Sequence, residues 1–326
     1  MDNVPIRLTC ADYARVMPLT TGAVRGDGVD LHLVLGAGGS WRDRAELIRR
    51  ALVDPSVHGG EASMGIHLRR IDQGDRSFVA LPVFVLRNFT ARDLYVRQDS
   101  ALREAKNLIG KRVGMYAWTA SGSIWYRHFL NHVGVDPAAV QWCIGEVDAP
   151  SSGIRDPAMP SAVSAAPAGR SLSAMLRDGE LDAIYSPSRP AGHHPVNGPI
   201  KRLFPDFRAI EHSYFRQTGM FPPQHLVVLR RAVWEADRSL ARRITDAFIR
   251  CEDVFHAATQ SFPYVSPWLL ADLEESEALM GANPYAHGMA ANRAVMETFA
   301  DQAFRAGLTQ RRVAVDDYFA EYLASA

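Results

Sequence analysis

Three hydroxyl side chains, Thr119, Ser121 and Ser123, follow a short apolar segment and precede an apolar pattern with helical spacing. The first turn of a helix presents unpaired N–H groups and the positive end of the helix dipole, so hydroxyls added there can bind a carboxylate or phosphate. Tyr116 and Trp118 stand just before them and can pack against a ring. The segment therefore predicts a site for a small aromatic or anionic acid. The alternative is that Ser121 or Ser123 only caps the helix.

Two residues elsewhere in the chain have side chains suited to proton transfer. His225 precedes the apolar run Leu226–Leu229, which places it at a strand entrance, and an imidazole there can exchange protons near neutral pH. Glu61 and Ser63 lie in a polar stretch after a helix, which we interpret as a loop beside a binding cleft, and Glu61 could act as acid or base. The alternatives are a structural histidine and a surface glutamate.

Polar residues at three other strand ends are candidates for binding an acid. Arg87 follows an apolar strand and suits a bidentate carboxylate clamp, with a surface or interdomain salt bridge as the alternative. Asp12 and Tyr13 end the first expected strand, where Asp12 is a candidate for catalysis or for a helix N-cap. Ser186 and Arg189 could contact a second carboxylate, or they could belong to a turn bounded by prolines.

The overall charge and the apolar pattern exclude several classes of protein. The 36 basic and 36 acidic residues balance, which leaves no electrostatic footprint for nucleic acid or an anionic membrane surface. No stretch approaches the roughly 18 apolar residues of a membrane span. The first residues lack the pattern of a signal peptide, and the 3 cysteines form no CxxC pair. We therefore expect a cytoplasmic protein.

No motif in the sequence calls for a cofactor or a metal. The GxGxxG and GxxxxGK[ST] nucleotide fingerprints are missing, and so is the G-x-S-x-G nucleophile elbow. His128 and His132 have the i, i+4 spacing of a metal pair, but the HExxH glutamate is missing. We expect neither a cofactor nor a metal.

Apolar runs alternate with helical patterns, which predicts an α/β fold with mostly parallel sheets. The expected strands are Ile6–Cys10, Val29–Leu35, Phe78–Phe84, Leu94–Val96, Val113–Tyr116, Val140–Ile144 and Leu181–Ser186. The expected helices are one at about Trp41–Leu52, one that includes Ile124 to Val133, and Leu172–Arg177, Ala241–His256, Ala271–Leu279, Ala291–Ala306 and Asp316–Leu323. Residues 149–169 lack periodicity and predict a long loop.

A second strand–helix series is nested inside the first, which predicts two lobes. We expect residues 1–95 and 221–326 to form lobe one, with a helical tail, and residues 96–220 to form lobe two. The chain would cross between the lobes near Tyr95 and again near Phe221. In such folds small ligands bind in a cleft near the C-terminal ends of strands.

Several stretches resemble one family over almost the whole chain. They are Leu8-Thr-Cys-Ala-Asp-Tyr13, Pro82-Val-Phe-Val-Leu-Arg-Asn-Phe89, Leu108-Ile-Gly-Lys-Arg-Val-Gly114, the run from Arg170 to Pro187, Arg202-Leu-Phe-Pro-Asp-Phe207, Thr218-Gly-Met-Phe-Pro-Pro-Gln-His225, Asn283-Pro-Tyr-Ala-His-Gly288 and Ala291-Asn-Arg293. The chain resembles the 4,5-dihydroxyphthalate decarboxylase family, which has a type II periplasmic-binding-protein-like fold. Members typically continue the second stretch with Phe-Arg-His-Ser, whereas Phe89-Thr-Ala-Arg92 stands here.

The resemblance implies a cofactor-independent decarboxylase of a dihydroxylated aromatic acid, with two lobes around a central cleft. His225, Glu61 and Asp12 would then share the acid and base roles, and Arg87 would bind a carboxylate. The partner would be a small aromatic carboxylate, and the oligomeric state stays open, with a homo-oligomer as one alternative. Two other functions remain open: a solute-binding protein for an aromatic or sulfonated acid, and an enzyme of this fold that processes chorismate-derived acids.

Overall fold

The computed structural model describes residues 4–36, 41–259 and 266–325, which form two compact units. Unit 1 comprises Met1–Arg87, Phe221–Asp301 and Arg311–Ala326, and unit 2 comprises Asn88–Met220 and Gln302–Gln310. Each unit contains a sheet and helices, which confirms the predicted α/β class. Within the described ranges, no helix is both long and apolar enough to cross a membrane.

Unit 1 is built on a five-stranded sheet in the order β2-β1-β3-β11-β4. Its strands are β1 (Val4–Ala11), β2 (Val29–Gly36), β3 (Gly59–Ser63), β4 (Phe78–Arg87) and β11 (Pro223–Arg230). β1 runs parallel to β2 and β3, whereas β11 is antiparallel to β3 and β4. β4 is almost entirely buried, as its continuous apolar run predicts, and it tolerates Pro82 because it lies at the sheet edge.

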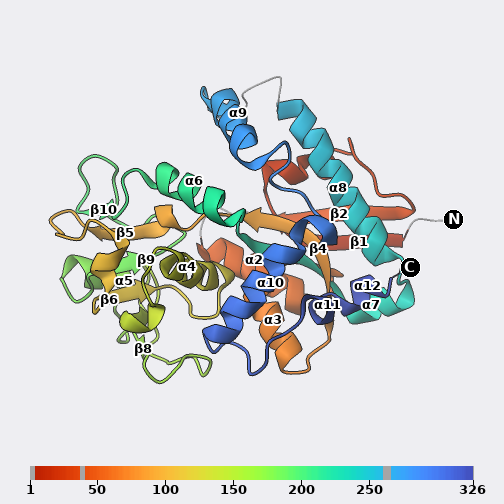
Figure 1. The fold of residues 1–326 in the computed structure, drawn as a ribbon. Coiled ribbons are helices and arrows are strands. Elements are labelled where there is room, and N and C mark those ends of the chain that lie inside the picture. Colours follow the sequence, from red (N-terminus) through yellow and green to blue (C-terminus); the bar gives the residue numbers. More distant parts are fainter. Residues whose placement is uncertain (1–3, 37–40, 260–265, 326) are drawn as a thin grey trace. The chain divides into compact units, whose positions relative to one another are not determined.

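Helices cover this sheet, and several of them come from the last third of the chain. The helices of unit 1 are α1 (Met17–Thr20), α2 (Trp41–Val53), α3 (Met64–Asp72), α7 (Arg231–Ala236), α8 (Leu240–Thr259), α9 (Leu269–Met280), α10 (Met289–Arg305), α11 (Val315–Tyr318) and α12 (Ala320–Leu323), with a short 3-10 turn at Ala14–Val16. α2 contacts β1 and β3, while α8 contacts β2 and β4 (Figure 1). The last residues of α10 belong to unit 2.

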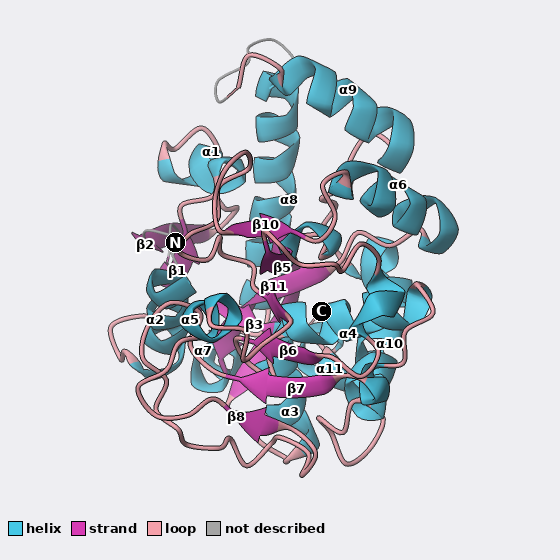
Figure 2. Ribbon diagram, turned by 90° about the vertical axis from the view of Figure 1, so that its left-hand side faces the viewer, coloured by secondary structure: helices cyan, strands magenta, loops and turns pink. Residues whose placement is uncertain are grey.

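Unit 2 is built on a six-stranded sheet in the order β10-β5-β9-β6-β7-β8. Its strands are β5 (Leu94–Arg97), β6 (Arg112–Met115), β7 (Gln141–Ile144), β8 (Ser164–Ala165), β9 (Ala183–Tyr185) and β10 (Ile200–Arg202). Figure 2 shows β6, β7 and β8 side by side, and these strands are parallel. The helices are α4 (Ser121–His132), α5 (Leu172–Arg177) and α6 (Phe207–Thr218), with 3-10 turns at Ala91–Asp93, Ala105–Leu108 and Pro137–Ala139.

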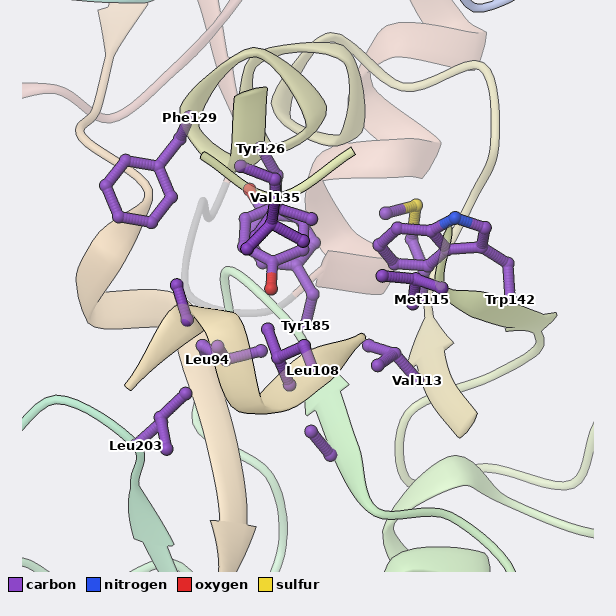
Figure 3. Close-up of a cluster of buried hydrophobic side chains, with 14 of the residues drawn as sticks. Leu94, Leu108, Val113, Met115, Tyr126, Phe129, Val135, Trp142, Tyr185 and Leu203 are labelled. Atoms are coloured by element: carbon purple, nitrogen blue, oxygen red, sulfur yellow. The ribbon is translucent and has the colours of Figure 1, made fainter. Parts of the chain in front are cut away.

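The core of unit 2 lies between α4 and its sheet. Tyr126 of α4 stacks on Tyr185 of β9 with ring centroids 4.1 Å apart and planes 5° apart (Figure 3). Trp142 of β7 meets Tyr126 edge-on, with the centroids 6.1 Å apart. Apolar residues of α4 recur at helical spacing and are buried, because this face of the helix covers the strands.

The structure differs from the sequence predictions in several places, and α3, α6, α7 and β10 were not predicted. The polar stretch expected as a cleft loop contains β3, all of whose residues are buried. The expected last helix divides at Phe319 into α11 and α12, and the expected long loop contains β8. The first crossing between units lies after Arg87 rather than near Tyr95, because β5 pairs with β9 and β10 and so belongs to unit 2.

Candidate active site

Two glycines allow β3 to approach its neighbours closely enough to place Glu61. Gly59 and Gly60 both have φ near +148°, a conformation that side-chain-bearing residues rarely adopt. A Cβ on Gly60 would lie 2.1 Å from Thr9 Oγ1, and one on Gly59 would lie 2.1 Å from the Val228 carbonyl oxygen. The next residue, Glu61, is therefore inserted deeply between β1 and β11.

The register of β3 against β11 brings Glu61 and His225 to the same face of the sheet. Glu61 stands opposite Val227, and His225 stands opposite Ser63, so Glu61 and His225 are diagonal neighbours. His225 Nδ1 lies 2.5 Å from Glu61 Oε1. The pairing of β11 with β4 is irregular on both sides of His225, and such bulges re-aim side chains.

Glu61 accepts two further hydrogen bonds from the end of β1. The backbone N–H of Ala11 donates to Oε2 at 3.0 Å, and the Tyr13 hydroxyl donates to Oε1 at 2.7 Å. Arg44 Nη1 donates to the Tyr13 oxygen and lies 3.8 Å from Glu61 Oε1. Because a guanidinium has only donors, the Tyr13 hydroxyl hydrogen must point to Glu61.

These contacts determine the protonation state of Glu61. The side chain is completely buried, and burial by itself would raise its pKa. The hydrogen bond and charge of His225 oppose burial, the bonds from Tyr13 and Ala11 add to this effect, and the pKa of Glu61 is lowered. Glu61 is thus an ionised, buried acceptor.

An ionised Glu61 also decides which nitrogen of His225 carries the proton in the neutral imidazole. Since the carboxylate can only accept, Nδ1 is the donor, and the lone pair lies on Nε2. The side chain of His225 keeps 8% of its surface exposed, and no residue that the structure describes hydrogen-bonds to Nε2. This arrangement can accept a proton at Nε2 and stabilise the resulting imidazolium with Glu61.

Arg44 is the member of this cluster that the sequence analysis did not identify. It lies in the first turn of α2, where the helix dipole disfavours a cation. A cation at this unfavourable position was the feature of the sequence that could have indicated a functional role for Arg44. Its guanidinium stands 5.3 Å from the centre of the Tyr13 ring. Burial, followed by the charge of Glu61, raises the pKa of Tyr13, so the hydroxyl stays protonated and keeps donating.

The structure brings together three of the predicted site residues of unit 1 in direct contact: Tyr13, Glu61 and His225. Ser63 is buried and is paired with His225 across the strands, so it borders the cluster. Asp12 follows the last residue of β1 and is exposed, whereas the contacts of Glu61 come from its neighbours Ala11 and Tyr13. The expected loop around Glu61 is a central strand, β3, and the alternative of a surface glutamate is wrong because Glu61 is buried.

Arg87 is held by protein groups rather than presented as an open fork. Its Nη1 donates to the Phe221 carbonyl at 2.9 Å, and Nη2 donates to the Ala286 carbonyl at 3.3 Å and to Asn292 Oδ1. Nε is buried and has no hydrogen-bond partner among the described residues. Both Nη atoms of the predicted clamp are thus engaged, and this arrangement favours a role in joining segments of unit 1 that are distant in the sequence.

The predicted hydroxyl segment of unit 2 forms the start of α4. The helix begins at Ser121 after an N-cap at Ala120 that has no side-chain cap bond, so neither Ser121 nor Ser123 is the N-cap. Trp118, Ser121 and Ser123 are buried, while Tyr116 and Thr119 are half-buried. Tyr116 lies 6.1 Å from the Tyr185 ring.

The second predicted carboxylate contact of unit 2 is arranged as a turn. The Ser186 hydroxyl donates to the Ser188 carbonyl at 2.6 Å and accepts from the Ser188 N–H at 3.2 Å. Arg189 is exposed. The side chain of Ser186 therefore stabilises the Ser-Pro-Ser-Arg-Pro segment, as the turn interpretation expects.

Comparison with known proteins supports one family. A 4,5-dihydroxyphthalate decarboxylase of Comamonas testosteroni is 27% identical over 327 residues, which covers 98% of this chain and 97% of the relative. The chain is a relative of the 4,5-dihydroxyphthalate decarboxylases. A second such enzyme, from Pseudomonas putida, is 28% identical over 66% of this chain and 83% of its own length. These matches confirm the resemblance carried by the sequence motifs. No protein-family profile matches the chain.

Solved structures of other proteins show which fold this chain has. The periplasmic aliphatic sulphonate binding protein SsuA from Escherichia coli superposes with a TM-score of 0.51 at 12% identity, covering 97% of this chain and 92% of its own. A ligand-binding component of an ABC-type import system from Staphylococcus aureus also has a TM-score of 0.51, at 11% identity over 99% of both chains. These likenesses confirm the predicted binding-protein-like fold.

Proposed function

We propose that this protein is a carboxy-lyase that removes one carboxylate from 4,5-dihydroxyphthalate, or from a close analogue, to give a dihydroxybenzoate. The relative from Comamonas testosteroni carries this activity in its name and matches nearly the full length of both chains. The observation that carries the proposal within the structure is the buried Glu61–His225 pair, because it presents a proton acceptor at Nε2.

The reaction needs proton transfer more than it needs an electron sink. A hydroxyl para to the carboxylate, once deprotonated, pushes electrons onto the carbon that bears the carboxylate. That carbon accepts a proton and the ring becomes a ketone. The carbon–carbon bond then breaks, CO2 leaves with its carbon and two oxygens, and the bonding electrons restore the aromatic ring. The phenol regains its proton, so the net change replaces one carboxylate with hydrogen.

His225 is suited to the first proton transfer. In its neutral form it holds Nδ1–H toward Glu61 and offers the Nε2 lone pair to a phenol. The imidazolium formed is stabilised by the buried carboxylate, whose own position is held by Tyr13 and by the Ala11 N–H. The same imidazolium can return a proton to the substrate. We propose Glu61 as the positioning residue for this step, and no cofactor is needed on this route.

The alternative function, a solute-binding protein, is less well supported by the site. A binding protein needs charges, donors and rings that hold its ligand, but it gains nothing from an imidazole oriented by a buried carboxylate. The likeness to the sulphonate-binding protein is at 12% identity and concerns the fold. The cytoplasmic location and the oligomeric state stay predictions.

The proposal is tested with the purified protein and a panel of aromatic acids. We expect CO2 release and a dihydroxybenzoate from 4,5-dihydroxyphthalate, without added cofactor and in the presence of EDTA. Phthalate, which lacks the para hydroxyl, should not be decarboxylated. Binding of 4,5-dihydroxyphthalate without CO2 release would contradict the enzyme and favour the solute-binding alternative.

A further inference from the structure

Unit 2 contains a buried cation without a counter-charge. Arg127 of α4 is 1% exposed, and no carboxylate in the part of the chain that the structure describes forms an ion pair with it. Its Nη2 donates to the Trp118 carbonyl at 3.1 Å, and Nη1 lies 3.8 Å from the Met115 sulfur. The guanidinium carbon stands 4.0 Å from the centre of the Trp118 ring. These neutral contacts do not neutralise the charge.

A buried guanidinium of this kind is energetically expensive. Burying a charge is strongly unfavourable unless the charge is paired and hydrogen-bonded. Burial lowers the pKa of Arg127 to about 9, so the group remains charged at neutral pH. Among the described residues, its Nε has no hydrogen-bond partner. The side chain therefore has an unmet requirement for a negatively charged acceptor.

Other unpartnered polar groups lie next to this guanidinium. Ser123 stands four residues before Arg127 and so one turn earlier on the same helix face. Its hydroxyl is buried with no partner in the described ranges, and the same is true of the indole N–H of Trp118. Both neighbours are near the start of α4, a 12-residue helix whose N-cap, Ala120, has no side-chain cap bond. The helix dipole adds positive potential at this end.

We propose that Arg127, Ser123 and the N-terminal turn of α4 form an anion site within unit 2 that binds the carboxylate of an aromatic acid. The guanidinium supplies the charge, and the hydroxyl and indole N–H supply donors that a carboxylate can satisfy. The need for an anion follows from the side chains alone. The choice of an aromatic carboxylate rests on the proposed function and on the ring of Trp118 beside the site.

The test compares phthalate binding by the parent protein and by Arg127→Met, using isothermal titration calorimetry on the full chain. We expect the variant to bind phthalate about 100-fold more weakly, because one partner of a buried charge pair is lost. Ser123→Ala should weaken binding less. Arg216→Met, which removes an exposed charge from the same unit, is the matched control and should bind as the parent does.

Thermal unfolding without ligand separates ligand binding from a purely structural role. If Arg127 serves the anion, Arg127→Met should keep or raise the unfolding midpoint, because an uncompensated buried charge is removed. A lowered midpoint together with unchanged phthalate affinity would overturn the proposal, as would a parent protein that does not bind phthalate. Because binding is measured apart from CO2 release, a protein that binds phthalate through Arg127 but turns nothing over would contradict only the proposed function.

Discussion

The side chain of Glu61 acts through His225, and this gives a prediction at the level of single residues. Glu61→Gln keeps the shape of the side chain but replaces the carboxylate with an amide whose N–H can donate to His225 Nδ1. The proton of the neutral histidine then moves to Nε2, so Nε2 can no longer act as the base. We expect turnover to fall about 10²–10⁴-fold in both Glu61→Gln and His225→Asn. Substrate affinity should change little, and steady-state kinetics with 4,5-dihydroxyphthalate measures both.

Tyr13→Phe is the matched control, because it removes one hydrogen bond to Glu61 and leaves the His225 contact in place. Its turnover should fall roughly 10-fold to 100-fold, in line with the loss of one hydrogen bond to an ionised carboxylate. Near-parental turnover in His225→Asn would transfer the proton role to another group. Weakened binding with unchanged turnover would instead make His225 a ligand contact.

Sequence reasoning found three of the four side chains in this cluster, but it could not find their contacts. Tyr13 and His225 were candidates because each stands near an expected strand end, and Glu61 was one because it lies in a polar stretch after a helix. Arg44 was missed because its role depends on how α2 packs against β1 and β3, which periodicity does not reveal. Arg87 was predicted as a clamp because it follows an apolar strand. The sequence could not show that carbonyls from distant segments occupy its Nη atoms.

At the level of elements, the close contact of β1 and β3 determines whether Glu61 is inserted correctly. A methyl group on Gly60 would lie 2.1 Å from Thr9 Oγ1 and 2.5 Å from the Thr9 carbonyl oxygen, so β1 or β3 must shift. We expect Gly60→Ala to lower the free energy of unfolding by about 3 kcal/mol or more, from strain in φ plus overpacking. Activity should fall further than stability explains, because Ala11 donates to Glu61.

Gly74→Ala separates these two causes. Gly74 also has a positive φ, +78°, but a Cβ there would meet nothing within 4 Å. This variant should lose only about 1 kcal/mol, from the backbone conformation alone, and should keep its activity. Urea unfolding of both variants measures the difference. Equal losses of stability would show that the contact with Thr9 is not tight.

Helices and strands were predicted correctly where the sequence has long apolar runs or clear helical periodicity. β4 and α8 were predicted because long apolar runs and helical periodicity survive without tertiary context. β3 was missed because Gly-Gly-Glu-Ala-Ser has no preference for a strand, and it becomes one only between β1 and β11. The same tertiary context that hides the strand from sequence reasoning also creates the site.

At the scale of the whole molecule, the two units should respond to pH in opposite directions. In unit 1 the pKa of Glu61 is lowered, so its stabilising effect is present above its ordinary pKa and is lost as the pH falls. In unit 2, burial raises the pKa of Asp93 to about 7 and that of Glu211 to about 6. These carboxyl groups bind protons more tightly in the folded state than in the unfolded chain. Their contribution is therefore fully present in acid and is lost as the pH rises.

Asp93 should have the largest effect on how the stability of unit 2 depends on pH, and Asp93→Asn tests this. The carboxyl group is 3% exposed, its Oδ1 lies 3.3 Å from Arg92 Nε, and its Oδ2 has no hydrogen-bond partner among the described residues. The shift from an ordinary value of 3.8 to about 7 corresponds to a stability loss on the order of 4 kcal/mol between about pH 4 and pH 8.

Hydrogen exchange across residues 88–220 should show unit 2 opening more readily at pH 8 than at pH 5. Asparagine cannot titrate, so Asp93→Asn should flatten this dependence, while Asp99→Asn, at an exposed carboxylate of the same unit, should leave it unchanged. An equally steep dependence in Asp93→Asn would assign the effect to Glu211.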